Sequence, residues 1–159
     1  MTQTYVSSDF IVDAIEDFWR MYKHKFPKVK KLLLNFDNGG ENSSRRTQFM
    51  KRMVEFVEKE QIDVELAYYP PYHSKYNPVE RVWGILEKHW NGTLLDSVSK
   101  VMGFAKSMTY NGISPIVTLV QKEYSIGVTL TKLEMQKVED KIVRLLGLEN
   151  WSVKISYQN

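Results

Sequence analysis

Two short apolar runs, separated by the pattern of an amphipathic helix, constrain this chain most. The runs cover residues 31–36 and 62–68, and each has the length of a strand and ends in turn residues. The first is expected to be a strand buried on both faces. The intervening helix is predicted to be capped by Ser43 or Ser44 and to bury Phe49, Met53, Phe56 and Val57. Two strands joined by a helix predict a right-handed parallel crossover, so both strands should end at the same edge of a sheet.

Helical spacing and capping signals predict four more helices. They are expected from Ser8 to Pro27, from Asn77-Pro78 to Gly92, from 94 to about 110, and from the capping box at Thr131 to about 146. The expected apolar stripes are Ile11, Ile15, Phe18 and Tyr22 in the first helix, and Val79, Val82, Trp83, Leu86 and Trp90 in the second. Residues 116–120 are expected to be extended, and residues 152–157 to form a terminal strand.

Composition narrows the class of protein. A chain of 159 residues with 43% hydrophobic side chains fits a single domain over 1–159. The absence of cysteine excludes disulfides, thiolate metal sites and a catalytic thiol. With no apolar run of the ~20 residues that a membrane span needs and no signal peptide, the sequence predicts a soluble, cytoplasmic protein without a membrane partner.

Positive charge is concentrated in one part of the chain. Residues 20–52 contain ten lysines and arginines and two acids, a net charge of +8 on a chain whose total is +3. A basic stretch on an otherwise acidic chain suits a polyanion partner, but it equally suits a solvated surface.

Carboxylates are the candidates for chemistry. Asp37 follows the first strand, and Glu80 lies in the first turn of the helix after the second strand, so the crossover predicts that they converge at one sheet edge. Two carboxylates favour Mg²⁺ or Mn²⁺, and two such ions suit phosphodiester chemistry. Alternatively, Asp37 only shapes a turn and Glu80 only completes a capping box. Glu41 and Glu87 are weaker candidates, expected to be exposed.

The loop after the second strand is rich in tyrosine. Tyr68, Tyr69, Tyr72 and Tyr76 lie near Lys75 and Arg81, where they either stack on bases or pack the loop itself.

Two segments resemble a known family. Residues 37–45 (DNGGENSSR) and 70–84 (PPYHSKYNPVERVWG) resemble the second and third acid motifs of DDE-type insertion-sequence transposases. The Asn-Pro-x-Glu-Arg-x-Trp part is shared with mariner-like relatives. The Gly-Gly turn, the gap of 42 residues between the two acids and residues 87–92 (EKHWNG) are similar to the Rhodopirellula-type transposase family, and the likeness spans roughly residues 30–156.

The resemblance implies an RNase H-like, retroviral-integrase-like α/β fold, of which this chain would be the C-terminal half with a family-specific extension over about 112–159. It implies two Mg²⁺ or Mn²⁺ ions, DNA cleavage by activated water, and joining of the 3′-hydroxyl to target DNA. By position, Asp37 and Glu80 would be metal ligands. The residues implied to line the site or contact DNA are Asn42, Arg45, Arg46, His73, Lys75, Asn77 and Arg81.

The family's first catalytic aspartate has no counterpart at the expected place. Asp9, Asp13 and Asp17 precede Asp37, but they lie in a predicted helix rather than a strand. The sequence therefore predicts a truncated transposase core, from a split reading frame, a decayed copy or a shortened chain, that is inactive alone. The alternative is a non-catalytic nucleic-acid-binding or interaction module. A lone parallel pair of strands leaves an open edge, which predicts a homo-oligomer.

Overall fold

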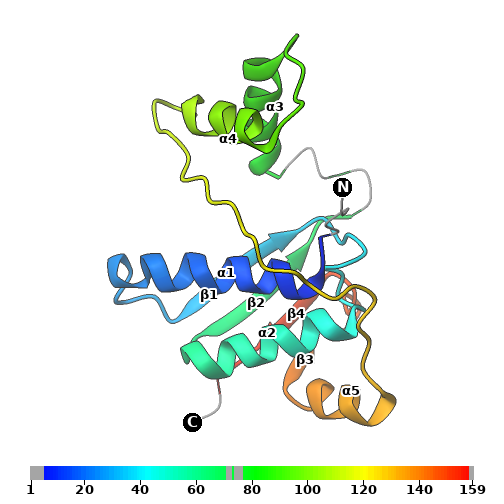
Figure 1. Cartoon of the computed structure of the whole chain (residues 1–159). Helices are drawn as coiled ribbons and strands as arrows, with labels where there is room; N and C mark the ends of the chain where they lie inside the picture. The colour runs from blue at the N-terminus through cyan, green and yellow to red at the C-terminus, as the bar shows by residue number, and fades with distance from the viewer. Residues whose placement is uncertain (1–5, 71–72, 74–76, 158–159) are drawn as a thin grey trace. The chain divides into compact units, whose positions relative to one another are not determined.

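The computed structural model describes residues 6–70, 73 and 77–157, which form two compact units. The first unit comprises residues 1–72 and 123–159, and the second comprises residues 73–122. Figure 1 labels their helices and strands. The assignment of 1–159 to one domain, with an extension from about residue 112, stays a prediction.

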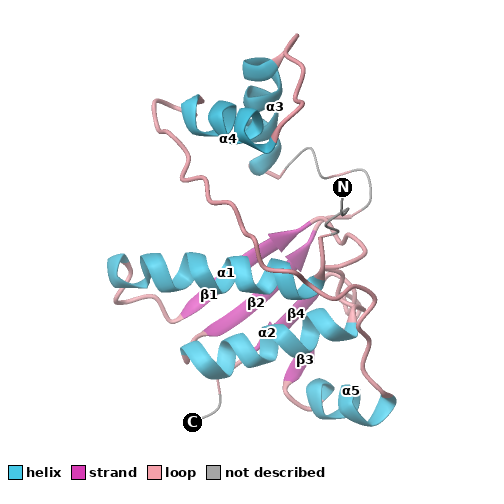
Figure 2. Ribbon diagram, in the orientation of Figure 1, coloured by secondary structure: helices cyan, strands magenta, loops and turns pink. Residues whose placement is uncertain are grey.

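A four-stranded mixed sheet organises the first unit (Figure 2). Strands β1 (Lys31–Phe36) and β2 (Asp63–Tyr68) run parallel and in register over their full lengths. Strand β4 (Ser152–Ile155) pairs antiparallel with β2 and with β3 (Ile142–Arg144), which gives the order β1-β2-β4-β3. The parallel crossover is confirmed. The expectation of a lone two-stranded pair is wrong, because β4 and β3 extend the sheet beyond β2.

Helices α1 (Ser8–Tyr22) and α2 (Thr47–Glu60) lie side by side over the sheet (Figure 2). The short 3₁₀ helix η1 (Lys23–Lys25) continues α1, and α5 (Lys132–Glu139) packs against α2 and β3. The predicted face of α2 is confirmed, since Phe49, Met53, Phe56 and Val57 are all buried. They join a core that includes alternate residues of the strands: Val64, Leu66, Tyr68, Ile142, Val153 and Ile155.

The edge position of β1 changes its expected burial. Its residues alternate between half-buried and exposed, and Leu33 is 58% exposed. Leu32, Leu34 and Phe36 pack on the core. The expectation of a strand buried on both faces is therefore wrong, because only one face of β1 meets the core.

The expected stripe of α1 is realised in part: Ile11 and Ile15 pack against the core, but the most buried residues lie one position further along the helix. Val12, Glu16 and Trp19 are buried, whereas Phe18 is 57% exposed. The Glu16 carboxylate can lie inside because Arg20 (3.3 Å) and Lys59 both pair with it. Hydrophobic spacing misses part of this face because one of its members is an ion-paired acid.

The end of the predicted helix after Thr131 is also corrected. The capping box of Thr131 and Glu134 is present, but α5 ends at Glu139, and residues 142–144 form β3 instead of a further helical turn. Pairing with β4 stabilises this extended conformation, and the partner strand lies about ten residues downstream. Residues 116–120 belong to no strand.

The second unit contains α3 (Val79–Trp90) and α4 (Val98–Ser107), which pack on each other. His89 joins them through a 2.9 Å hydrogen bond to Ser107 and an edge contact with Phe104. Helix α4 starts at Val98 rather than 94, because the Ser97 hydroxyl caps it. The predicted stripe of α3 is partly realised: Leu86 is buried and Trp83 is 56% exposed. Across the described residues, no helix is both long and apolar enough to cross a membrane.

Candidate functional site

The loop after β1 fixes the carboxylate of Asp37. Asp37 is exposed and directly follows Phe36, whose register partner is Tyr68 at the end of β2. Its Oδ1 accepts two hydrogen bonds, from the Gly39 amide and from Asn42 Nδ2, both at 3.1 Å. The turn alternative is thus realised with one oxygen of the carboxylate. The Oδ2 oxygen accepts no hydrogen bond from any described residue.

Packing around Asp37 is close at Gly39. A Cβ atom added there would lie 3.3 Å from both Asp37 Oδ1 and Asn42 Oδ1, whereas one added at Gly40 would meet nothing within 4 Å. The Asn42 Oδ1 atom is buried and has no hydrogen-bond partner among the residues that the structure describes. Two oxygen atoms beside the turn, Asp37 Oδ2 and Asn42 Oδ1, therefore keep acceptor capacity.

The rest of the loop is anchored to distant parts of the chain. Glu41 accepts hydrogen bonds from the amide (3.2 Å) and hydroxyl (3.1 Å) of Ser8, and it pairs with Arg46 at 3.1 Å. The Ser44 hydroxyl donates to the Asn150 carbonyl, and Arg45 Nε donates to Asn150 Oδ1. Glu41, which was expected to be exposed, is thus half-buried and holds the loop on the start of α1.

Sequence patterns missed the contribution of Asn150. It lies more than 100 residues from Ser44 and Arg45, just before β4, and no local motif marks it. Its place is set by the pairing of β4 with β2. Only the long-range topology of the sheet brings it to this loop.

Glu80 lies on the exposed first turn of α3 in the second unit. The Asn77 side chain accepts from the Val79 amide (3.4 Å), while the Glu80 carboxylate makes no hydrogen bond or ion pair with any described residue. Among the described residues, Glu80 therefore does not complete a capping box, and that alternative is wrong. Arg81 beside it is also exposed.

The predicted site residues are divided between the two units. Asp37, Asn42, Arg45 and Arg46 belong to the first unit, and His73, Asn77, Glu80 and Arg81 to the second. Lys75 lies outside the described residues, as do Tyr72 and Tyr76. Within 6–70, 73 and 77–157, no group of three or more histidine, aspartate or glutamate side chains could hold a metal ion. The convergence of Asp37 and Glu80 stays a prediction.

Three other residues considered from the sequence, Asp9, Asp13 and Tyr68, have structural roles. Asp9 and Asp13 on α1 each accept a 2.8 Å hydrogen bond from Arg52 on α2, so they join the two helices. Tyr68 is 6% exposed and packs near Phe36, so the packing alternative holds for this tyrosine. Burial raises the pKa of the Tyr68 phenol well above its usual range, and the nearby charge of Arg144 only partly offsets this shift.

The fold and the loop after β1 place this chain among mixed α/β proteins that carry acidic residues after neighbouring parallel strands. A mixed α/β sheet carries an exposed aspartate at the carboxyl end of a parallel strand, and a glutamate opens the helix that follows the neighbouring strand. The chain belongs to the family of the Rhodopirellula transposase DDE domain, whose family model matches residues 1–157. Comparison with curated proteins and with solved structures gives no match.

Proposed function

We propose that this chain carries two acids of a DDE transposase core, Asp37 and Glu80, for metal-dependent cleavage and strand transfer of transposon DNA. Membership of the transposase DDE-domain family supports this reading. The single structural observation that carries it is the Asp37 carboxylate, exposed at the end of β1 with one oxygen fixed by the turn. The relation to mariner-like transposases and the RNase H-like fold belong to the same proposal.

The oxygen donors of the loop fit a hard divalent cation. Asp37 offers Oδ2, and Asn42 offers a buried amide oxygen without a partner. Carboxylate and amide oxygens are the ligands that Mg²⁺ and Mn²⁺ prefer. Asp37 would hold the cation together with Glu80, and the Gly39 amide would keep the carboxylate oriented. A pair of such cations, when bound, activates the attacking oxygen and stabilises the leaving one.

The third acid of the triad is proposed to come from a longer parent or another chain. Asp9 and Asp13 on α1 are engaged by Arg52 on α2, and they belong to a helix rather than to a strand. We therefore expect this chain alone to be inactive in nicking, because positioning of two metals depends on the full ligand set. DNA contacts are proposed for Asn42, Arg45, Arg46, His73, Lys75, Asn77 and Arg81.

The test is a calorimetric Mn²⁺ titration of the wild type, Asp37→Asn and Glu80→Gln at fixed pH and salt. Asp96→Asn is the matched control, because it removes one exposed acid whose ion pair in the structure is with Lys100. We expect saturable binding that weakens at least tenfold in both site variants and is unchanged in the control. Equal binding by all four proteins would contradict the proposal.

A non-catalytic nucleic-acid-binding module is the second candidate. The observation in its favour is that Asp37 already makes a turn bond to Gly39, which a purely structural aspartate would also make. Absence of Mn²⁺ binding together with retained DNA binding would favour this module.

A further inference from the structure

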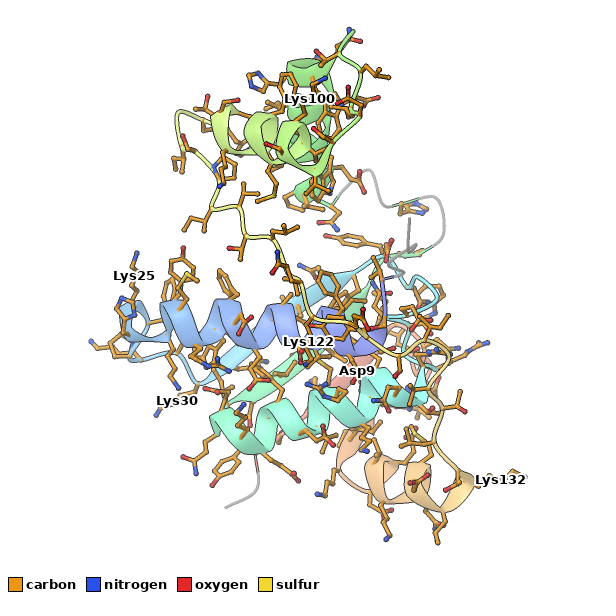
Figure 3. The ribbon with its side chains drawn as sticks, in the orientation of Figure 1. Asp9, Lys25, Lys30, Lys100, Lys122 and Lys132 are labelled. Carbon is orange, nitrogen blue, oxygen red and sulfur yellow. The ribbon has the colours of Figure 1, made fainter. Side chains whose placement is uncertain are left out.

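The turn from α1 to β1 presents positive charge and nothing negative. We call residues 23–31 (KHKFPKVKK) the basic turn; it contains five lysines, one histidine and no acid, and all nine residues are exposed. Figure 3 shows Lys25 and Lys30 extending outward at the same end of the first unit. This end lies at the start of β1, opposite to the loop of Asp37.

Neighbouring acids neutralise only part of this charge. Lys23 pairs with Glu60 and Lys31 with Glu65, each at 2.8 Å, and Arg20 at the end of α1 pairs with Glu16 and Asp17. Lys25, Lys28 and Lys30 have no carboxylate partner among the described residues. Three uncompensated ammonium groups therefore lie within six consecutive positions, which favours an anionic partner.

Exposed rings accompany these lysines. Phe18 is 57% exposed and Phe26 is 48% exposed, although burial of such side chains is strongly favoured. The Phe18 and Tyr22 rings lie 5.0 Å apart, and Lys25 Nζ lies 5.1 Å from the centre of the Tyr22 ring. The rings of Phe18 and Tyr22 and the ammonium group of Lys25 thus lie side by side.

Backbone hydrogen bonds hold the basic turn in a defined conformation. The Phe26 amide donates to the Lys23 carbonyl (3.0 Å), and the Val29 amide donates to the Phe26 carbonyl (3.1 Å). Pro27 further restricts the chain between them. The lysines and Phe26 are therefore presented on an ordered turn, which lowers the entropy lost on binding.

We propose that the basic turn and the rings of Phe18 and Phe26 bind single-stranded DNA. Lys25, Lys28 and Lys30 would contact phosphates, and the exposed rings would stack on bases, the combination that suits single strands. The surface lies about 20 Å from Asp37, the length of β1 at roughly 3.3 Å per residue. It would hold an unpaired segment outside the cleavage site. The choice of DNA as the polyanion rests on the proposed function.

Fluorescence anisotropy with a labelled 20-nucleotide oligothymidine tests this surface, with EDTA present and salt varied. In the triple variant Lys25→Gln, Lys28→Gln, Lys30→Gln, the negative slope of log affinity against log salt should become shallower by about 2, because three phosphate contacts are lost. Phe18→Ala and Phe26→Ala should each weaken binding roughly fivefold to a hundredfold with little change of slope. Binding of a duplex of the same length should respond to the lysine changes but not to the ring changes.

Matched controls separate this surface from general charge. Lys106→Gln, Lys132→Gln, Lys137→Gln removes three exposed lysines elsewhere, and Leu133→Ala removes an exposed apolar side chain on α5. Both controls should bind like the wild type. The proposal is overturned if the control triple variant makes the salt dependence equally shallow. It is also overturned if the ring variants bind single strands with the affinity of the wild type.

The remaining outcome is that the surface meets protein rather than DNA. In that case the ring variants would change the molar mass of the protein in light scattering and leave its DNA affinity unchanged, which would also overturn the proposal. Failure here is distinguishable from failure of the proposed function. The anisotropy assay excludes divalent cations, whereas the calorimetric assay measures Mn²⁺ binding at Asp37 and Glu80.

Discussion

Two adjacent glycines after Asp37 differ in the space around them, which makes a matched pair of substitutions possible. In Gly39→Ala, the new Cβ would lie 3.3 Å from Asp37 Oδ1 and Asn42 Oδ1, which is tighter than an ordinary contact, so these two side chains must give way slightly. We expect a loss of about 1 kcal/mol in the free energy of unfolding, a drop of about 2–4 °C in Tm, and weaker Mn²⁺ binding. Thermal melting and calorimetry measure both effects.

Gly40→Ala is the control, because nothing lies within 4 Å of its added Cβ. It should leave the Tm and the Mn²⁺ affinity near those of the wild type. Equal behaviour of the two variants would show that close packing at Gly39 does not position Asp37.

A buried hydroxyl at the end of β2 predicts a pH effect on stability. Within the described part of the chain, Tyr68 OH has no hydrogen-bond partner, and burial raises the pKa of the phenol. Above pH ~10 the unfolded chain releases this proton while the folded chain keeps it, so stability falls as pH rises, by up to about 1.4 kcal/mol per pH unit. Below pH 10 this contribution is constant.

Tyr68→Phe tests this effect by removing the ionisable group. Urea unfolding between pH 8 and 11 should show a smaller loss of stability in the variant than in the wild type. At pH 7 the variant should be more stable by about 1 kcal/mol, because an unsatisfied buried hydroxyl is removed. An identical pH dependence in both proteins would contradict the assignment. Tyr69→Phe, on the neighbouring half-buried tyrosine, serves as the control.

At the scale of elements, the packing of α1 on α2 depends on Arg52. Its guanidinium bonds to Asp9 and Asp13 at 2.8 Å each, and its side chain is 20% exposed. Arg52→Met should lower the free energy of unfolding by about 1–3 kcal/mol, because the half-buried carboxylates of Asp9 and Asp13 lose the cation that joins them, although Gln48 and Tyr124 still donate hydrogen bonds to them. Chemical denaturation measures this change. Lys51→Met is the control, since its 3.8 Å contact with Glu55 is exposed, and it should shift stability by less than ~0.5 kcal/mol.

The sequence predicts a helix or strand correctly where local residues determine its conformation, and fails where contacts with distant parts of the chain determine it. The strands 31–36 and 62–68 and the buried face of α2 follow from local spacing and turn residues, and they are confirmed with at most one residue of difference. Strand β3 was expected to be helix, because its conformation depends on pairing with β4. The buried face of α1 is predicted only in part: Ile11 and Ile15 pack on the core, but the buried, ion-paired Glu16 is not part of a hydrophobic pattern.

The candidate site likewise has parts that local sequence predicts and parts that depend on distant contacts. The local turn of Asp37 was foreseen from Asp-Asn-Gly-Gly, and the structure adds Asn42 as its second donor. The role of Asn150 needed the whole sheet, since no spacing relates it to Arg45. The relation of Asp37 to Glu80 follows from crossover geometry alone and stays a prediction.

At the scale of the whole molecule, β1 is one of the two edge strands of the described sheet and the longer of them. The carbonyls of Lys30 and Phe36 accept hydrogen bonds from the amides of Asp63 and Tyr69, at the two ends of β2. In a parallel ladder, successive residues direct their backbone groups alternately toward and away from the neighbouring strand. Lys31, Leu33 and Asn35 accordingly direct their backbone groups away from β2. Such an edge is a template for pairing with another strand, and charged side chains such as Lys31 only partly protect it.

We expect the protein to form a dimer or higher oligomer through this edge. Light scattering at micromolar concentration should give a molar mass at least twice that of the 18.7 kDa chain. Asn35→Pro removes an outward amide and leaves the bonds to β2 in place, so it should shift the protein toward monomer while retaining its fold by circular dichroism. Asn35→Ala, which keeps the amide, should remain oligomeric. A monodisperse wild-type monomer would contradict edge pairing. An oligomer that Asn35→Pro leaves intact would place the interface elsewhere, and the exposed rings at the basic turn would be the next surface to test.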